Sequence, residues 1–342
     1  MATTTEASQA DGLQTLADHF KDRPLSEHGS RWNTCWQRNQ TDWDRGQHSV
    51  ALLEILTQGL PPQNDDEGQG RTAGELFPGH PCCSSGSSTT ITTDSGDQYR
   101  HGRRRPKALV PGCGRGYDVL LLGSLGYDVV GLDLSPIGIQ RAREHAERSQ
   151  KDGTYPVKLA GGVVQHASPE PGSFQFVEGD FFKDDWLEQV SGGGGGGEKD
   201  VKFDLIFDYT FGCALPPSAR PQWANRLSSL LLRPGGRLVC LEFPSTKSPD
   251  EPGPPWAMPP GVYERYLGGR NSSSSSSSSN IQGSRVGRGG GEEEEESAGG
   301  AGLKRLIHGK PTKTHAAGMR EEDDGKGGKT MVVVDCVSVW SH

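Results

Sequence analysis

Short apolar runs alternate with longer amphipathic stretches along the central part of the chain, between residues 106 and 242. The apolar runs have the length of buried strands, and the stretches between them repeat apolar residues at helical spacing. We predict strands at 108–110, 128–132, 174–178, 203–208 and 237–242, and helices at 117–125, 136–149, 183–190 and 218–231. This alternation indicates a doubly wound α/β fold, in which helices flank a parallel sheet and the crossovers are right-handed.

The segment before the sheet carries three tryptophans, Trp32, Trp36 and Trp43, at separations of four and seven residues. On one continuous helix these rings would lie within about 40° of a single stripe. Ser30 stands where the N-cap of such a helix is expected. The stripe suits either a helix docked on the core or a lid over a binding site.

Three glycines at alternate positions, Gly112, Gly114 and Gly116, follow the first predicted strand and precede a helix. Glycine lets a cofactor approach bare backbone, and it adopts positive φ in a tight turn. Asp133 ends the next strand, where a carboxylate can accept both hydroxyls of a ribose. A dinucleotide fingerprint needs a third glycine at the sixth position, and neither Gly112 nor Gly114 is followed by one. The turn therefore favours S-adenosylmethionine, with an NAD-dependent oxidoreductase as the less favoured alternative.

Three stretches lack apolar periodicity and are rich in small or charged residues, at about 63–104, 191–198 and 268–300. Stretches of this composition bury too little apolar surface to offset the entropy of ordering them. We expect them to be low-complexity insertions, and we expect residues 1–29 to be a disordered tail. The remainder, about 250 residues, has the size of one domain. We therefore predict a single domain over residues 30–342.

Acidic residues exceed basic ones, and the formal net charge of the 342-residue chain is −8. One basic cluster, at 100–107, precedes the first strand, whereas a nucleic-acid enzyme normally has a broader basic face. The seven cysteines show no paired Cys-x2-Cys spacing, and the chain has neither a hydrophobic leader nor an apolar stretch of membrane-spanning length. We expect a soluble, cytoplasmic monomer that acts on small molecules, without nucleic-acid, membrane or metal partners.

Taken together, the tryptophan segment and the glycine turn resemble the thiopurine methyltransferase family, and most closely its halide and thiol methyltransferase branch. The spacing Trp-x3-Trp-x6-Trp, ending in Trp-Asp-x-Gly, is the more specific part of this resemblance. The similarity continues at 176–182, 203–215 and 232–244, and in all it covers about 30–62, 106–267 and 303–341. It implies a class I methyltransferase fold, with a seven-stranded, mostly parallel sheet and an antiparallel last strand at 331–340.

The resemblance also implies which residues bind S-adenosylmethionine. Gly112 is the expected backbone approach to the methionine portion, and Asp133 is the expected ribose ligand. Asp180, at the end of the third strand, is expected to hold the adenine amino group, with Phe181 beside the adenine ring. For Asp180 there is an alternative interpretation as the N-cap of the helix that follows.

Tyr209, just past the fourth strand, is also expected to contact the cofactor, and to face the pocket where the cofactor and the methyl acceptor meet. The three tryptophans would then form a lid near the sulfonium of the cofactor. Tyr209 and Trp256 are the candidates for positioning the acceptor, and no residue is assigned as catalytic. A general base is optional, because a thiol is already partly ionised at neutral pH. His308 and His315 are further candidate bases, although neither lies in a recognisable motif.

Two residues depart from the pattern of the family. Asp42 stands where the family usually has the proline of Thr-Pro-Trp-Asp, and Trp256 stands where its halide and thiol branch commonly has a tyrosine after Gly-x-Pro-Pro. We predict an S-adenosylmethionine-dependent methyltransferase whose acceptor is a small soft nucleophile: a thiol, hydrosulfide, thiocyanate or a halide. The two departures leave open a related protein that binds the cofactor and has little turnover.

Overall fold

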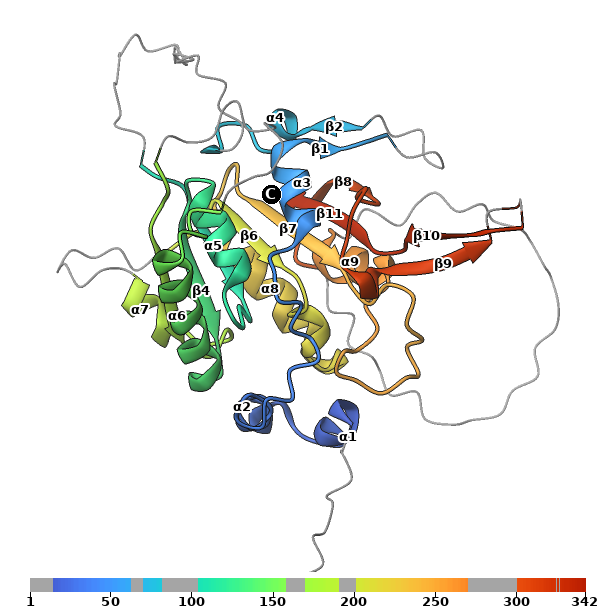
Figure 1. Ribbon diagram of the computed structural model, residues 1–342, viewed down its shortest axis with the longest axis horizontal. Helices are drawn as coiled ribbons and strands as arrows, with labels where there is room; N and C mark the ends of the chain where they lie inside the picture. The colour runs from blue at the N-terminus through green and yellow to red at the C-terminus, as the bar shows by residue number, and fades with distance from the viewer. Residues whose placement is uncertain are drawn as a thin grey trace, which may run out of the picture.

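The computed structural model describes residues 15–62, 70–81, 104–157, 170–190, 201–269, 300–323, 325 and 327–342. Its centre is a seven-stranded sheet in the order β5-β4-β3-β6-β7-β11-β8. The strands are β3 (Lys107–Pro111), β4 (Asp128–Asp133), β5 (Phe174–Glu178), β6 (Leu205–Asp208), β7 (Arg237–Glu242), β8 (Lys304–Gly309) and β11 (Cys336–Ser341). The strands from β5 to β7 pair in parallel, whereas β11 runs antiparallel to both β7 and β8. The predicted class I sheet with an antiparallel last strand is confirmed (Figure 1).

Helices cover both faces of this sheet (Figure 1). One face carries α3 (Val50–Thr57), α5 (Tyr117–Ser124) and α6 (Pro136–Lys151), and the other carries α7 (Asp185–Val190), α8 (Arg220–Leu230) and α9 (Pro260–Leu267). Two short 3-10 helices, η3 (Gly212–Ala214) and η4 (Pro217–Ala219), lie between β6 and α8. Because side chains alternate along a strand, Leu241 and Val337 belong to the first apolar layer, and Cys240 and Trp340 belong to the second.

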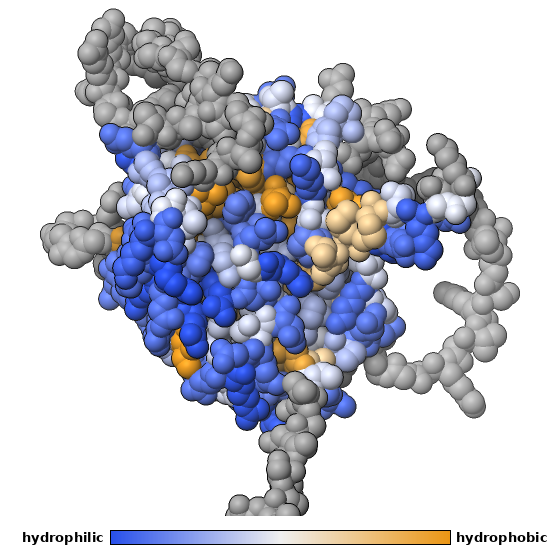
Figure 2. All heavy atoms as spheres, viewed as in Figure 1, coloured by the Kyte–Doolittle hydropathy of each residue, from blue (hydrophilic) through white to orange (hydrophobic). Residues whose placement is uncertain are grey.

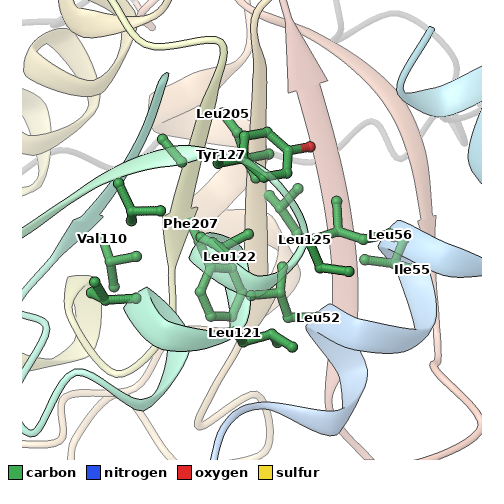
Figure 3. Packing of buried hydrophobic residues seen from close by; sticks show 14 of the residues in the cluster. Leu52, Ile55, Leu56, Val110, Leu121, Leu122, Leu125, Tyr127, Leu205 and Phe207 are labelled. Carbon is green, nitrogen blue, oxygen red and sulfur yellow. The ribbon is translucent and has the colours of Figure 1, made fainter. Parts of the chain in front are cut away.

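Helix α3 is fastened to the sheet by its apolar side. In Figure 3, Leu52, Ile55 and Leu56 of α3 lie next to Leu122 of α5 and to Leu125, the residue that caps the end of that helix, in one buried cluster. Burying an aliphatic side chain of this size contributes about 1.5–3 kcal/mol. The α3 segment is therefore held firmly against α5.

The tryptophans do not share one helix, contrary to the prediction. Helix α2 (His28–Gln37) begins before Ser30, whose hydroxyl donates to the Glu27 carbonyl instead of capping the helix. The helix ends because Asn39 adopts a left-handed φ of 53° and the Gln40 amide donates back to the Cys35 carbonyl, which is a Schellman ending.

The tryptophan rings nevertheless meet, because the chain turns back after α2. The ring centre of Trp43 lies 5.1 Å from that of Trp32 and 5.6 Å from that of Trp36. The aromatic cluster thus depends on the turn after α2 and does not require a longer helix.

Two regions expected to lack structure are partly ordered. Within residues 1–29, α1 (Leu16–Phe20) and η1 (Leu25–Glu27) precede α2, and Phe20 is buried with its ring 4.5 Å from that of Trp32. Within 63–104, the chain forms β2 (Arg71–Thr72), which pairs with β1 (Gly59–Leu60), and α4 (Ala73–Leu76). The apolar side chains of Leu76 and Phe77 are buried there. The other parts of the expected tail and insertions, residues 1–14, 63–69, 82–103, 191–198 and 270–299, lie outside the described residues.

The last strand is shorter than predicted. Residues 331–340 divide between β10 (Lys329–Val333), which forms a hairpin with β9 (Met319–Asp323), and β11 in the main sheet. The chain changes direction at Val334 and Asp335, where the Val334 amide donates to Gly318, at the end of η5 (Ala316–Gly318). The interruption places the buried Asp335 at the end of the main sheet.

The surface that Figure 2 displays is mostly hydrophilic. The large apolar side chains exposed in the described part of the chain are Leu134 and Met331. Among the helices described, none has the length and apolar character needed to cross a membrane.

Candidate active site

The glycine turn and the end of β4 form one hydrogen-bonded unit. Gly112, Gly114 and Gly116 have φ angles of 60°, 51° and 75°, a region that favours glycine. Asp133 accepts the Gly114 amide at 3.0 Å through Oδ2 and the Ser135 amide at 2.9 Å through Oδ1. Burial raises the pKa of Asp133, and these amides oppose the rise. A carboxylate held beside bare backbone at this end of the sheet fits the ribose and methionine portions of S-adenosylmethionine.

Trp36, which is 4% exposed, lies across this turn. Its ring is 3.5 Å from the position that a Cβ on Gly114 would take, and its Nε1 is 3.1 Å from the equivalent position on Gly138. The ring contacts of Trp32 and Trp43 are with other aromatic residues of the N-terminal segment. Trp36 is therefore the member of the predicted lid that reaches the cofactor turn.

Two polar contacts hold the N-terminal segment against the turn. Arg115 forms an ion pair with Asp44, and its guanidinium lies 5.7 Å from the centre of the Trp36 ring. The Ser49 amide donates to Asp118 Oδ1 at 2.7 Å. Sequence reasoning missed these contacts, although Asp44 stands in the Trp-Asp-x-Gly motif and Arg115 stands inside the glycine turn.

Asp180 and Phe181 lie where β5 ends. Asp180 Oδ1 accepts the Phe182 amide at 3.0 Å, and α7 begins only at residue 185, so Asp180 is not the N-cap of that helix. Phe181 is buried with its ring centre 4.9 Å from that of Phe211. Phe211 in turn lies against Gly112, where a Cβ would be 2.7 Å from its ring. The end of β5 thus joins the glycine turn through aromatic contacts.

A small cavity lies beside Tyr209, which follows β6 at the carboxyl end of the sheet. Its lining residues are Arg45, Gln47, His48, Ser49, Val50, Tyr209 and His315. The cavity volume is about 20 Å³, and a single water needs about 10–15 Å³, so the space suits a very small ligand. The Tyr209 hydroxyl is buried and has no hydrogen-bond partner among the described residues. Burial raises the pKa of Tyr209, and the nearby Arg45 opposes the rise.

His315 and Asp335 stand behind this cavity. The His315 ring centre lies 5.3 Å from that of Tyr209 and 4.9 Å from that of Phe243. His315 Nε2 is 3.2 Å from Asp335 Oδ2, although the geometry does not make a hydrogen bond. The sequence offers His315 as a candidate base without a supporting motif, and it gives no signal that singles out Asp335.

Trp256, the second candidate for positioning the acceptor, lies elsewhere. Its ring stacks on His28 of α2, with ring centres 5.9 Å apart and planes at 8°. Its amide donates to the Cys213 carbonyl at 2.8 Å. The residues that line the Tyr209 cavity do not include it.

The opposite face of the sheet holds a second polar group. Glu242 is 0% exposed, and its Oε2 lies 3.1 Å from His308 Nε2. One ligand atom each from Glu242, His308 and Cys336 lie within 4.8 Å of one another, a mixed donor set that could hold a metal ion. Contacts with Cys336 and Glu242 raise the pKa of His308 to about 9. With its pKa raised in this way, the His308 imidazole is protonated at neutral pH and pairs with Glu242 Oε2, while Glu242 Oε1 has no hydrogen-bond partner among the described residues.

Comparison with known proteins adds to this geometry. The sequence profile of the family described as thiopurine S-methyltransferase matches residues 97–296. The probable thiol methyltransferase 2 of Arabidopsis thaliana is 30% identical over 262 residues, which cover 76% of this chain and 81% of that protein. Thiocyanate methyltransferase 1 of Brassica oleracea is 28% identical over 236 residues, or 69% of this chain and 70% of that protein.

Two other similarities are more distant. Thiopurine S-methyltransferase of Vibrio campbellii is 30% identical over 174 residues, which cover 50% of this chain and 69% of that protein. A solved magnesium protoporphyrin IX methyltransferase from Synechocystis shares 13% identity over 70% of this chain and 74% of that chain, with a TM-score of 0.37. A likeness of that size adds nothing to the sequence relationships.

Proposed function

Because this chain belongs to the thiopurine S-methyltransferase family, we propose that it methylates a small soft nucleophile: hydrosulfide, another thiol, thiocyanate or a halide. The protein is a methyltransferase and S-adenosylmethionine is its cofactor, as the glycine turn predicted. The family, the fold class and the reaction class predicted from the sequence are thereby confirmed. The proposal of a small acceptor is supported by the cavity beside Tyr209.

The cavity beside Tyr209 is the observation that carries this proposal. Its volume of about 20 Å³, on the measure by which one water needs about 10–15 Å³, gives room for about one or two water-sized groups, fewer than a fused-ring thiopurine would need. Arg45 brings a positive charge to its lining, and the Tyr209 hydroxyl has a free donor. A small anion, or a thiol that becomes one, is the ligand that such a lining favours. The names of the two plant relatives, which refer to thiol and thiocyanate as acceptors, favour the same class.

The residues of the turn would bind the cofactor, which supplies an electrophilic methyl group on a sulfonium. Asp133 would accept the ribose hydroxyls, and Gly112 would let the methionine portion approach the backbone. Asp180 would hold the adenine amino group with Phe181 beside the ring. Trp36 would cover the site, where an aromatic face near a sulfonium contributes about 0.5–2 kcal/mol. The chain then acts mainly by positioning the reactants and excluding water.

Tyr209 would position the acceptor by donating its hydroxyl to the bound anion. Trp32 and Trp43 support this arrangement indirectly, because they pack the segment that carries Trp36 and Arg45. Trp256 is less suited to position the acceptor, because it packs on His28 and does not line the cavity.

A turnover assay tests the proposal. Purified protein is supplied with S-adenosylmethionine and, separately, with hydrosulfide, thiocyanate, iodide and a thiopurine, and the methylated products are measured by gas or liquid chromatography. We expect methanethiol, methyl thiocyanate or iodomethane to form much faster than methylated thiopurine. Calorimetry with S-adenosylmethionine and with NAD runs in parallel. NAD serves as the negative control for binding, and cofactor binding without turnover of any of these acceptors would reject the proposed acceptor class.

We also propose that the protein works as a monomer in the cytoplasm, without nucleic-acid or membrane partners. The described cysteines, Cys35, Cys113, Cys213, Cys240 and Cys336, are free thiols, which is typical of proteins in a reducing compartment. The net charge of −8 opposes binding to nucleic acid and to anionic lipid. Cell fractionation tests the location, and size-exclusion chromatography with light scattering tests the assembly.

A further inference from the structure

The loops around β9 and β10 bring an imidazole and a carboxylate to the acceptor cavity. We propose that His315, oriented by Asp335, takes the proton from a bound thiol, so that the enzyme is built for protonated sulfur acceptors, hydrogen sulfide and small thiols. The proposal rests on the proposed function and narrows its acceptor class. Halides and thiocyanate carry no proton at neutral pH, so they would react without this step.

The packing around Asp335 holds it next to His315. Its side chain is 2% exposed and that of His315 is 10% exposed, with His315 Nε2 and Asp335 Oδ2 3.2 Å apart. Gly318 leaves room for the carboxylate, because a Cβ there would lie 2.0 Å from Asp335 Oδ2. The Ser245 hydroxyl lies 3.4 Å from the other carboxylate oxygen. A small shift of the imidazole would therefore complete the hydrogen bond from Nε2 to Oδ2.

Several buried polar atoms at this place lack partners. Neither ring nitrogen of His315, nor Asp335 Oδ2, nor the Tyr209 hydroxyl has a hydrogen bond among the described residues. Leaving such a group unsatisfied costs stability, and unpartnered polar atoms in a native structure call for an explanation. A thiol in the cavity would supply the missing partner of His315 Nδ1, while Nε2 turns to Asp335.

The charges around His315 suit this chemistry. Arg45 and His48 face the cavity from the segment before α3, and Tyr209 faces it from the end of β6. Burial, with smaller contributions from Asp118 of α5 and from Asp335, raises the pKa of Tyr209, which keeps its hydroxyl protonated as a donor. Arg45 is the permanent cation of the set, so it stabilises a thiolate once the proton has left.

The acceptor gives its proton to His315 before it takes the methyl group. The S–H bond of the acceptor breaks, its electron pair stays on sulfur, and the proton binds His315 Nδ1 as Nε2–H donates to Asp335. The thiolate then forms a bond to the transferred methyl carbon, and the old carbon–sulfur bond breaks with its electrons on the departing, now neutral, sulfur. The proton returns to solvent. Only a few per cent of a thiol with a pKa near 8.5 is ionised at pH 7, so the step raises the reactive fraction substantially.

Variants at the pair separate this role from simple positioning. In His315→Gln and Asp335→Asn we expect kcat/KM for a small thiol to fall roughly 10²-fold at pH 6.5, the lower end of general-base effects. The fall for hydrogen sulfide should be smaller, because it is more acidic than a thiol and is already partly ionised at that pH. The loss should shrink above pH 9, where the thiol ionises in solution. Rates with thiocyanate and iodide should stay within about twofold of wild type. His145→Gln, on α6 away from the cavity, is the matched control and should change neither rate.

A second readout does not depend on turnover. The protein is loaded with S-adenosylhomocysteine, and the His315 ring signal, identified by its loss in His315→Gln, is followed by NMR at pH 7. Adding hydrogen sulfide should protonate the ring, whereas adding thiocyanate should not. An unchanged ring, or an equal loss of thiol and thiocyanate activity in His315→Gln, would overturn the proposal. Wild-type protein that methylates no acceptor would instead reject the proposed function, independently of the ring signal.

Discussion

Two histidine–carboxylate pairs lie on opposite faces of the same end of the sheet, and they differ in how far their polar atoms are hydrogen-bonded. His308 and Glu242 face the layer that contains α8 and α9, are hydrogen-bonded at 3.1 Å, and include a fully buried carboxylate. His315 and Asp335 face the acceptor cavity, are equally close at 3.2 Å, and have unsatisfied polar atoms. In the first pair Glu242 Oε1 is the buried atom that lacks a hydrogen-bond partner among the described residues, whereas the second pair has three such atoms, His315 Nδ1, His315 Nε2 and Asp335 Oδ2.

The difference indicates how similar residues come to serve stability or chemistry. A buried pair that satisfies its own charges fixes the local structure, and removing one partner leaves an uncompensated charge. A pair with free hydrogen-bonding atoms beside a cavity costs stability and gains a function when a ligand supplies the partner. Substitutions at the two pairs and at the cofactor turn should therefore affect stability and ligand binding differently.

The largest expected effect is on stability, at the pair of His308 and Glu242. His308→Ala leaves the Glu242 carboxylate buried without its cation, which should lower the free energy of unfolding by about 3–5 kcal/mol. Urea titration followed by circular dichroism measures it. Lys304→Ala, at an exposed position of the same strand, is the control and should change little. A His308 variant as stable as the control would show that the pair contributes nothing.

The cofactor turn offers the next test, in binding instead of folding. Asp133→Ala removes the expected ribose acceptor, so S-adenosylmethionine should bind about 2–4 kcal/mol more weakly by calorimetry. Glu178→Ala is the matched control, because Glu178 is the exposed register partner of Asp133 on β5. Unchanged affinity in a folded Asp133 variant would reject the ribose assignment.

The charge pair also predicts a pH dependence. Contacts with Cys336 and Glu242 raise the pKa of His308 from 6.5 to about 9. The stability from this group is therefore fully present below pH 6.5 and is lost as the pH rises through 9, by at most about 3 kcal/mol. Unfolding free energies at pH 6 and pH 9.5 measure it. If His308→Ala shows the same decline as wild type, another group causes it.

The smallest effect on stability is expected at the acceptor cavity, where polar atoms lack hydrogen-bond partners. Tyr209→Phe removes a buried hydroxyl without a hydrogen bond, so the free energy of unfolding should stay the same or rise by up to about 1 kcal/mol. The KM for thiocyanate should rise severalfold, because the expected donor to the anion is gone, with little change in cofactor affinity. A clear loss of stability would mean that the hydroxyl has a partner in solution.

Sequence reasoning was most successful where function follows from a short stretch of chain. Gly112, Gly114 and Asp133 lie within one strand–helix–strand unit, so their spacing alone indicated the cofactor turn. The acceptor side could not be predicted in that way. His315 and Asp335 are separated by a hairpin, and Tyr209 reaches them from a different strand, so no spacing pattern links the three.

Errors in the predicted elements have similar causes. The spacing of Trp32, Trp36 and Trp43 predicts one continuous helix, but it does not show the Schellman ending at Asn39, which stops α2. The apolar run at 331–340 was treated as one strand, because the alternation of side chains does not show that its first half pairs with β9. In both places, the apolar spacing fits the predicted element, but specific backbone hydrogen bonds end or divide that element.

The sequence by itself determined the alternation of strands and helices, the glycine turn, the family and hence the cofactor. These follow from steric limits and apolar periodicity acting over a few residues. Only the tertiary structure decided that Arg115 holds Asp44 and that the segment leading into α3 lines the acceptor cavity. It also decided that His308 and His315 have opposite environments. The physical reason is that burial and electrostatic pairing depend on distance in space, and residues far apart in the chain become neighbours only when the sheet and its layers have assembled.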